Sequence, residues 1–304
     1  MTEKPSYDAV IATGGLAGLG AALALASKGR KTAIVEPGGS LLWELGRARQ
    51  WLGSKDQMPM YPMLTCPVLS QLAQLDVIRN DEWEPVLAEI AADRLAADAG
   101  IDIFFQSRVA RFTEQYDGLQ LTVAQKGKVS MVMAGQLIQL DDRKRCRSIE
   151  GGTPPEHDLY AVTWAGCSVE EPVEAFVQLP TGSVPVRVRR TAWANECCAD
   201  IALPLREPGQ SSSELEFAAL YEPLMLALKE QVPALADASP VYISDEPWRW
   251  SAHAPRGRIV SGKQPVKELT GEALTDGGFT WSECRKQLYQ WLLLGQEAAD
   301  AALR

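Results

Sequence analysis

Apolar, small and polar residues near the amino terminus follow each other in an order typical of one folding unit. A short β-branched run, Val10–Ile11, leads into a glycine-rich stretch, Gly14–Gly18, and Ala/Leu-rich sequence then continues to Lys28. A second apolar run, Thr32–Val35, ends at the acidic residue Glu36. The pattern predicts a strand, a tight turn, a helix and a second strand that ends in a carboxylate.

This order is that of the first βαβ unit of a dinucleotide-binding domain. Glycines at the turn let the backbone approach a pyrophosphate, and the free N–H groups at the start of the helix point at it. The acid lies eighteen residues past Gly18, where it can accept hydrogen bonds from a ribose. We therefore predict that the cofactor contacts Gly14, Gly15, Leu16, Ala17, Gly18 and Glu36.

One position departs from this fingerprint. Thr13 stands where the first glycine of Gly-x-Gly-x-x-Gly is expected. A β-branched residue there disfavours a positive φ and narrows the turn. Two interpretations stay open: a drifted site that still binds its nucleotide, and a Rossmann scaffold that has lost its ligand. NAD(P) in the same turn is a further alternative, and Glu36 would then favour NAD because a carboxylate repels a 2′-phosphate.

The rest of the chain predicts an α/β protein with a β-rich insertion. Helical sequence at Pro62–Arg79 and Glu82–Asp98 is followed by a strand, Ile101–Phe105, and a β-meander. Strand patterns then dominate Leu159–Leu205, and the final helix covers Ser282–Leu303. We predict a Rossmann-like FAD/NAD(P)-binding domain made of residues 1–142 and 239–304, with an inserted β-rich substrate domain at 143–238.

The segment after Glu36 allows two interpretations. Leu41–Gly53 reads as a short helix or an irregular segment that carries Arg47, Arg49 and two tryptophans. Those side chains would lie near the nucleotide's phosphates, or the arginines would form a solvated face beside a buried tryptophan.

Composition limits the partners. The net charge of −9 disfavours nucleic acid and anionic membranes, and no apolar run is long enough to cross a bilayer. The amino-terminal residues lack a secretory signal, and the six cysteines show neither disulfide-scaffold density nor metal-binding spacing. The expectation is a cytoplasmic protein without a metal site.

At this level the order of elements resembles the FAD-dependent oxidoreductases with a glutathione-reductase-like nucleotide domain. The resemblance implies FAD as cofactor, with the adenine beside Val109, the ribityl chain beside Gly262, and a closing helix that carries the Gly-x-x-Ala-Ala of Gly295–Ala299. Two further departures accompany Thr13. Lys263 stands where the family has an acid, although a lysine could pair with the pyrophosphate. Leu140–Asp142 stands where many members have Ala-Thr-Gly after the meander.

A flavin would carry the redox chemistry itself, so no catalytic triad is required. His253 is the candidate catalytic residue, because a histidine near the flavin could move a proton, whereas His157 is expected to be solvated. The prediction is an oxidoreductase that passes a hydride from an organic small molecule to FAD, with a homodimer or a partner oxidoreductase as its assembly. The alternative is a non-catalytic accessory or binding protein on the same scaffold.

Overall fold

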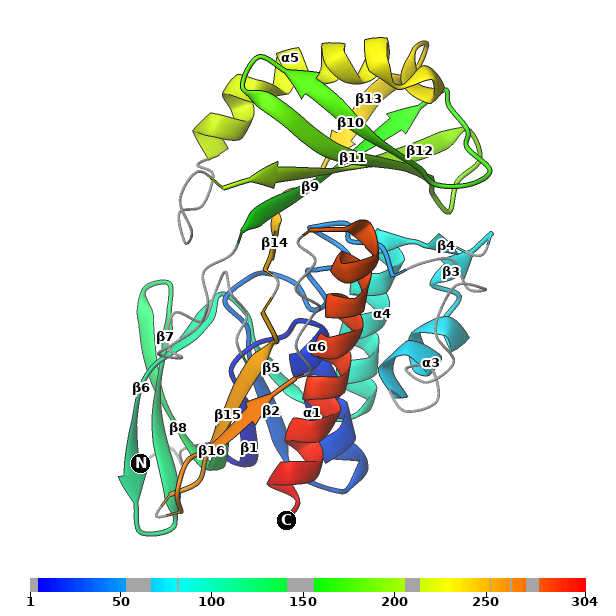
Figure 1. The fold of residues 1–304 in the computed structure, drawn as a ribbon. Helices are drawn as coiled ribbons and strands as arrows, with labels where there is room; N and C mark the ends of the chain where they lie inside the picture. Colours follow the sequence, from blue (N-terminus) through cyan, green and yellow to red (C-terminus); the bar gives the residue numbers. More distant parts are fainter. Residues whose placement is uncertain are drawn as a thin grey trace.

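The structure is a computed structural model that describes residues 5–52, 67–80, 82–140, 156–205, 214–251, 253–262, 264–271 and 279–304. Figure 1 shows two sheets stacked one above the other, each with helices packed on it. Lys263, the Asp141–Asp142 pair and the polar crossing that precedes residue 156 lie outside the described residues.

The lower sheet has the predicted Rossmann-like core. Its strands are ordered β16-β15-β8-β1-β2-β5, and β1 (Ser6–Ile11) pairs in parallel with both β2 (Thr32–Val35) and β8 (Lys128–Leu140). The strand β5 (Asp102–Phe104) extends the parallel set beside β2. The four residues of β2 are all buried, as expected for a parallel strand covered on both faces.

Different elements cover the two faces of this sheet. Helices α1 (Leu16–Ser27), α4 (Pro85–Asp98) and α6 (Trp281–Ala302) share one apolar cluster on one face. The meander strands β6 (Ser107–Gln115) and β7 (Gly118–Gln125) close a second cluster on the other face. Helix α3 (Pro67–Gln74) and the short pair β3 (Ile78–Arg79) and β4 (Glu82–Trp83) pack against the cluster of the helical face.

The upper sheet is antiparallel. Its strands are β9 (His157–Ala165), β10 (Val173–Leu179), β11 (Gly182–Arg190), β12 (Glu196–Pro204), β13 (Ser239–Ile243) and β14 (Trp248–Trp250). Helix α5 (Glu214–Gln231) lies on its outer face, followed by the short 3₁₀ turn η2 (Pro233–Leu235) (Figure 1). Both β13 and β14 pair with β9, so this sheet recruits strands from beyond residue 238. A mixed α/β fold with a separate β-rich layer is thus confirmed.

The last two strands of the lower sheet form an antiparallel hairpin at its edge. Strand β15 (Arg256–Val260) pairs antiparallel with β8, and β16 (Lys267–Thr270) pairs antiparallel with β15. It follows that β16, rather than β15, runs in the same direction as β1. The chain therefore leaves β15 at the amino end of β1 and leaves β16 at its carboxyl end.

Candidate dinucleotide site

The glycine turn lies where the sequence places it, at the carboxyl end of β1 and the start of α1. The Gly14 N–H donates to Oε2 of Glu36 at 2.7 Å, and the Gly38 N–H donates to Oε1 at 2.5 Å. Glu36 is fully buried. Its carboxylate therefore fastens the end of β2 to the glycine turn through backbone hydrogen bonds.

Gly18 packs the helix against the turn. A Cβ at this position would collide with the backbone carbonyl of Thr13, so only glycine lets α1 begin this close to β1. Gly295 has the same effect on the other side of α1, because its Cβ would collide with the Ala17 carbonyl. The two glycines hold α6, α1 and β1 in close contact.

Thr13 fits the turn without the conformation that glycine usually supplies. It is not among the described residues with positive φ, and its side chain is buried. Its hydroxyl accepts a hydrogen bond from the Gly15 N–H at 3.3 Å. The substitution at the first fingerprint position is thus accommodated by an inward side chain that bonds the turn itself.

The amino end of α1 is capped by a distant carboxylate. Gly15 is the N-cap and has no side chain to offer, and the Leu16 N–H donates to both carboxylate oxygens of Glu44, at 3.0 and 3.1 Å. Glu44 is 7% exposed. A negative side chain at a helix amino end is stabilised by the unpaired N–H groups and by the helix dipole.

The space that the glycines leave open is filled by the chain itself. A Cβ on Gly15 would collide with Oε1 of Glu44, and a Cβ on Gly14 would collide with Cδ2 of Leu41. The Leu42 N–H also donates to the Gly14 carbonyl at 2.9 Å. Residues that follow Glu36 therefore cover the turn at close range.

These contacts belong to a segment that we call the inner strap, residues Ser40–Leu52. Nearly all its apolar side chains are buried: Leu41, Leu42, Trp43, Leu45, Ala48, Trp51 and Leu52. Its last residue accepts a hydrogen bond from the Tyr289 hydroxyl of α6. The inner strap is an irregular buried segment between the two layers.

For the two arginines of the inner strap, the sequence allowed a position near the nucleotide's phosphates or on a solvated face. Their contacts lead away from the turn. Arg47 donates to Oγ of Ser40 at 3.2 Å and lies 4.0 Å from a Glu246 carboxylate oxygen. Arg49 lies 3.8 Å from the ring centre of Tyr242 and donates to the Thr163 hydroxyl, so it reaches the upper sheet.

A dinucleotide does not fit this arrangement. Its pyrophosphate would need the helix amino end whose Leu16 N–H already serves Glu44, and it would bring two phosphates against a buried carboxylate. Glu36 and the glycines match the fingerprint, but the inner strap fills the space above the glycines that a pyrophosphate would need. The described residues therefore do not form a FAD pyrophosphate site while Glu44 lies on α1.

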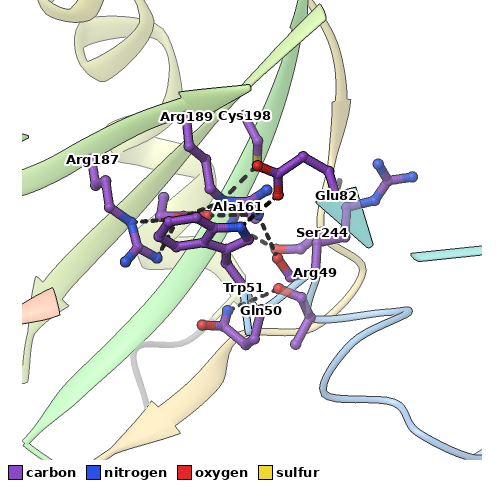
Figure 2. Close-up of polar contacts among 11 residues, drawn as sticks. Arg49, Gln50, Trp51, Glu82, Ala161, Arg187, Arg189, Cys198 and Ser244 are labelled. Atoms are coloured by element: carbon purple, nitrogen blue, oxygen red, sulfur yellow. Dashed lines mark hydrogen bonds and ion pairs between the residues drawn. The ribbon is translucent and has the colours of Figure 1, made fainter. Parts of the chain in front are cut away.

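The inner strap ends in a polar cluster against the upper sheet (Figure 2). The Trp51 Nε1–H donates to Oε2 of Glu82 at 2.8 Å. The guanidinium carbons of Arg187 and Arg189, on β11, lie 4.6 and 5.7 Å from the Trp51 ring centre. Arg285 of α6 lies 5.6 Å from the same ring.

Asp200 on β12 joins the two arginines of this cluster. Its Oδ2 accepts from Nη2 of Arg187 at 2.6 Å and from Nε of Arg189 at 2.9 Å, and all three residues are buried. Burial alone would raise the pKa of Asp200, but the charges of Arg189 and Arg187 outweigh it and hold the pKa below its usual value. The group is ionised and fully engaged at neutral pH.

Sequence reasoning missed this cluster, although a signal was present. Arg187 and Arg189 stand two apart and alternate with the valines of their strand, so both side chains point to the same face. Two cations on a buried face require an anion, and the facing strand β12 carries one, Asp200, paired with Arg187 in register. The alternation could therefore have been recognised as a buried ion-pair site.

The other predicted site residues lie apart from the turn or in a different setting. Val109 is a half-buried residue of β6 that packs on the meander side of the sheet. Gly262 lines a cavity of about 440 Å³ together with Asp8 and Gly118, at the amino end of β1. The antiparallel direction of β15 carries Gly262 away from Gly14, toward the amino end of β1. The ribityl contact at Gly262 stays a prediction.

The histidines also differ from expectation in part. His253 is exposed on the loop before β15. Its backbone N–H donates to the Ser251 hydroxyl, and its backbone carbonyl accepts from the Gln287 side chain. His157 is half-buried rather than solvated, and its ring stacks 4.6 Å from the Phe279 ring. Desolvation lowers the pKa of His157 below its usual value.

The described residues contain no group of acidic, histidine or cysteine side chains arranged to hold a metal ion. Within the same residues, no helix is long and apolar enough to cross a membrane.

Comparison with known proteins shows the fold. No protein-family model matches the sequence, and no curated protein matches it. The structure resembles p-nitrophenol 4-monooxygenase PnpA from Pseudomonas putida DLL-E4, with a TM-score of 0.62, 14% identity, and coverage of 99% of this chain and 78% of that one. It also resembles NikD, an unusual amino acid oxidase, with a TM-score of 0.56, 14% identity, and coverage of 99% and 95%.

The aromatic hydroxylase CabE is similar at a TM-score of 0.52 and 13% identity, over 83% of this chain and 53% of CabE. The chain thus spans about half the length of CabE. At such identities the likeness establishes a fold: the Rossmann-like core and separate antiparallel sheet of FAD-binding flavoproteins.

Proposed function

We propose that this chain is a binding or accessory protein built on the fold of flavin-dependent oxidoreductases, and that it holds no dinucleotide at its glycine turn. One observation carries the proposal: the Glu44 carboxylate bonds the Leu16 N–H and fills the space above Gly15. An anion already at the helix amino end repels a second one and uses the donor it needs. A partner oxidoreductase is the assembly we propose for such a protein.

The absorption spectrum of the purified protein tests this proposal. It is recorded as isolated and again after FAD has been added and the excess removed. A protein that stays colourless on both occasions supports an accessory role. Bands near about 450 nm that survive removal of free FAD, the signature of bound flavin, would overturn it.

A second candidate is a FAD-dependent oxidoreductase acting on an organic small molecule. It is favoured by the buried Glu36 at the end of β2, which lies where a ribose-binding acid is expected, and by the similarity to a monooxygenase and an oxidase. In this candidate the inner strap leaves the turn before the cofactor enters. NAD at the same turn is tested by repeating the absorption measurement after NADH, in place of FAD, has been added and the excess removed.

The variant Glu36→Ala separates the two candidates further. If the wild type binds FAD through this acid, the variant weakens binding by about tenfold to a hundredfold, the scale of a charge-assisted hydrogen-bond pair. In an accessory protein the same change alters only stability, through the lost bonds to Gly14 and Gly38.

A further inference from the structure

We infer that the inner strap is an intramolecular ligand that fills two subsites of a dinucleotide site: Glu44 takes the anion position and Trp51 takes an aromatic position between the layers. The inference rests on the proposed function and extends it, because it says what occupies the site and which chemical groups would replace that occupant.

The anion end is defined by contacts that a phosphate would otherwise make. Helix α1 has no side-chain cap of its own, and its donor is satisfied by a carboxylate 28 residues away in the sequence. That carboxylate is more than nine-tenths buried and lies over a glycine that tolerates no Cβ. The turn retains the geometry for an anion, and the chain supplies that anion.

The aromatic end is defined by cations gathered around one indole. Three guanidinium groups, from Arg187, Arg189 and Arg285, lie within 5.7 Å of the Trp51 ring centre. They come from β11 of the upper sheet and from α6, so the indole lies between the two layers. Figure 2 shows Trp51 beside Arg187 and Arg189. A guanidinium group stacks on the face of a planar aromatic ring, and the indole is the ring present here.

The two ends are joined by buried chain. Residues Leu45–Gln50 connect them, and the Arg49 carbonyl in this connection accepts from Nη2 of Arg189 at 3.0 Å. A dinucleotide likewise joins a diphosphate to an aromatic ring through a flexible linker. The inner strap thus reproduces the order of groups that such a ligand presents, from the helix amino end to the opposite layer.

The test removes one end of the occupant at a time and measures binding of three probes: ADP, riboflavin and FAD. Flavin fluorescence reports riboflavin and FAD, and calorimetry reports ADP. Glu44→Ala is expected to bind ADP and FAD at least about tenfold more tightly than wild type, with riboflavin unchanged. Trp51→Ala is expected to bind riboflavin and FAD more tightly than wild type by a similar factor, with its affinity for ADP unchanged.

Glu44→Gln is the matched control, because its amide oxygen can still accept from the Leu16 N–H and keep the helix capped. Loss of the negative charge should leave its ADP affinity between those of wild type and Glu44→Ala. Circular dichroism verifies that each variant is folded. If Glu44→Ala does not fold, Glu44→Gln alone decides. The inference is then overturned if Glu44→Gln binds ADP no more tightly than wild type.

The outcomes separate this inference from the function on which it rests. If wild type binds no FAD and the folded variants gain none of the probes, the accessory role stands and the intramolecular ligand is refuted. If wild type already binds FAD, the accessory role fails. A gain of ADP in Glu44→Ala and of riboflavin in Trp51→Ala supports both.

Discussion

The contact between Gly15 and Glu44 can be measured as a coupling between two substitutions. The backbone of Gly15 has φ −68° and ψ −170°, which any residue adopts, so Gly15→Ala introduces no conformational strain. The three atoms nearest to the new methyl group all belong to the Glu44 carboxylate, which stands where the methyl group would lie. We therefore expect the cost of this substitution to depend on Glu44.

The magnitudes follow from that geometry. Glu44→Ala removes a charge-assisted hydrogen bond to a buried N–H and should lower the free energy of unfolding by about 2–3 kcal/mol. Gly15→Ala either displaces the same carboxylate or compresses it, at a cost of about 2–3 kcal/mol. In the Glu44→Ala background the methyl group enters vacated space, so the second cost falls to about 1 kcal/mol, that of a poorer N-cap.

Urea unfolding of wild type, both single variants and the double variant gives the coupling as a double-mutant cycle. We expect a coupling of about 1–2 kcal/mol. Gly20→Ala is the control on the same helix: its Cβ would meet only a Val68 methyl at 3.7 Å, so it should stabilise by about 0.5–1 kcal/mol. Costs that add within about 0.5 kcal/mol would refute the reasoning, because Gly15 would then serve something other than Glu44.

Three further predictions concern the rest of the fold. Asp200→Asn leaves two buried arginines without their anion and should lower the free energy of unfolding by about 3–5 kcal/mol. Urea unfolding measures this loss, and a value below about 1 kcal/mol would contradict the ion-pair assignment. Gly295→Ala should cost about 1–3 kcal/mol, since its methyl group meets the Ala17 carbonyl, and an unchanged thermal midpoint would count against that close contact. Burial lowers the pKa of His157 in the folded protein, so below pH 6.5 the unfolded state binds a proton more readily than the folded state. The free energy of unfolding should therefore fall as the pH is lowered below 6.5. His157→Gln should lessen that decline when unfolding is compared at several pH values, and an identical pH profile would refute the role.

The local part of the fold could be predicted from sequence. The βαβ unit over Tyr7–Glu36 is encoded by neighbours in the chain: strand pattern, glycines and helix periodicity act within a few residues of each other. The packing role of Gly18 could be predicted for the same reason, because the Thr13 carbonyl that it contacts is only five residues away in the sequence. These expectations agree with the structure because each depends on local geometry.

The remainder depends on long-range contacts that spacing does not encode. Glu44 reaches Leu16 across 28 residues, and nothing in the local pattern distinguishes it from a solvated acid. The direction of β15 depends on a hairpin with β16, whose strand is only four residues long. Spacing alone therefore left two positions open for Arg47 and Arg49, and it suggested a place for Gly262 beside the cofactor although the strand before it runs antiparallel to β8.

The close contact of α6 with α1 also sets an order for folding. The Gly295–Ala17 contact and the hydrogen bond from Gln136 to the Ala302 carbonyl join residues far apart in the chain. On a ribosome the lower layer stays incomplete until α6 has emerged. Until then the amino end of α1 and the inner strap lack the contacts that Gly295 and Tyr289 of α6 make with Ala17 and Leu52.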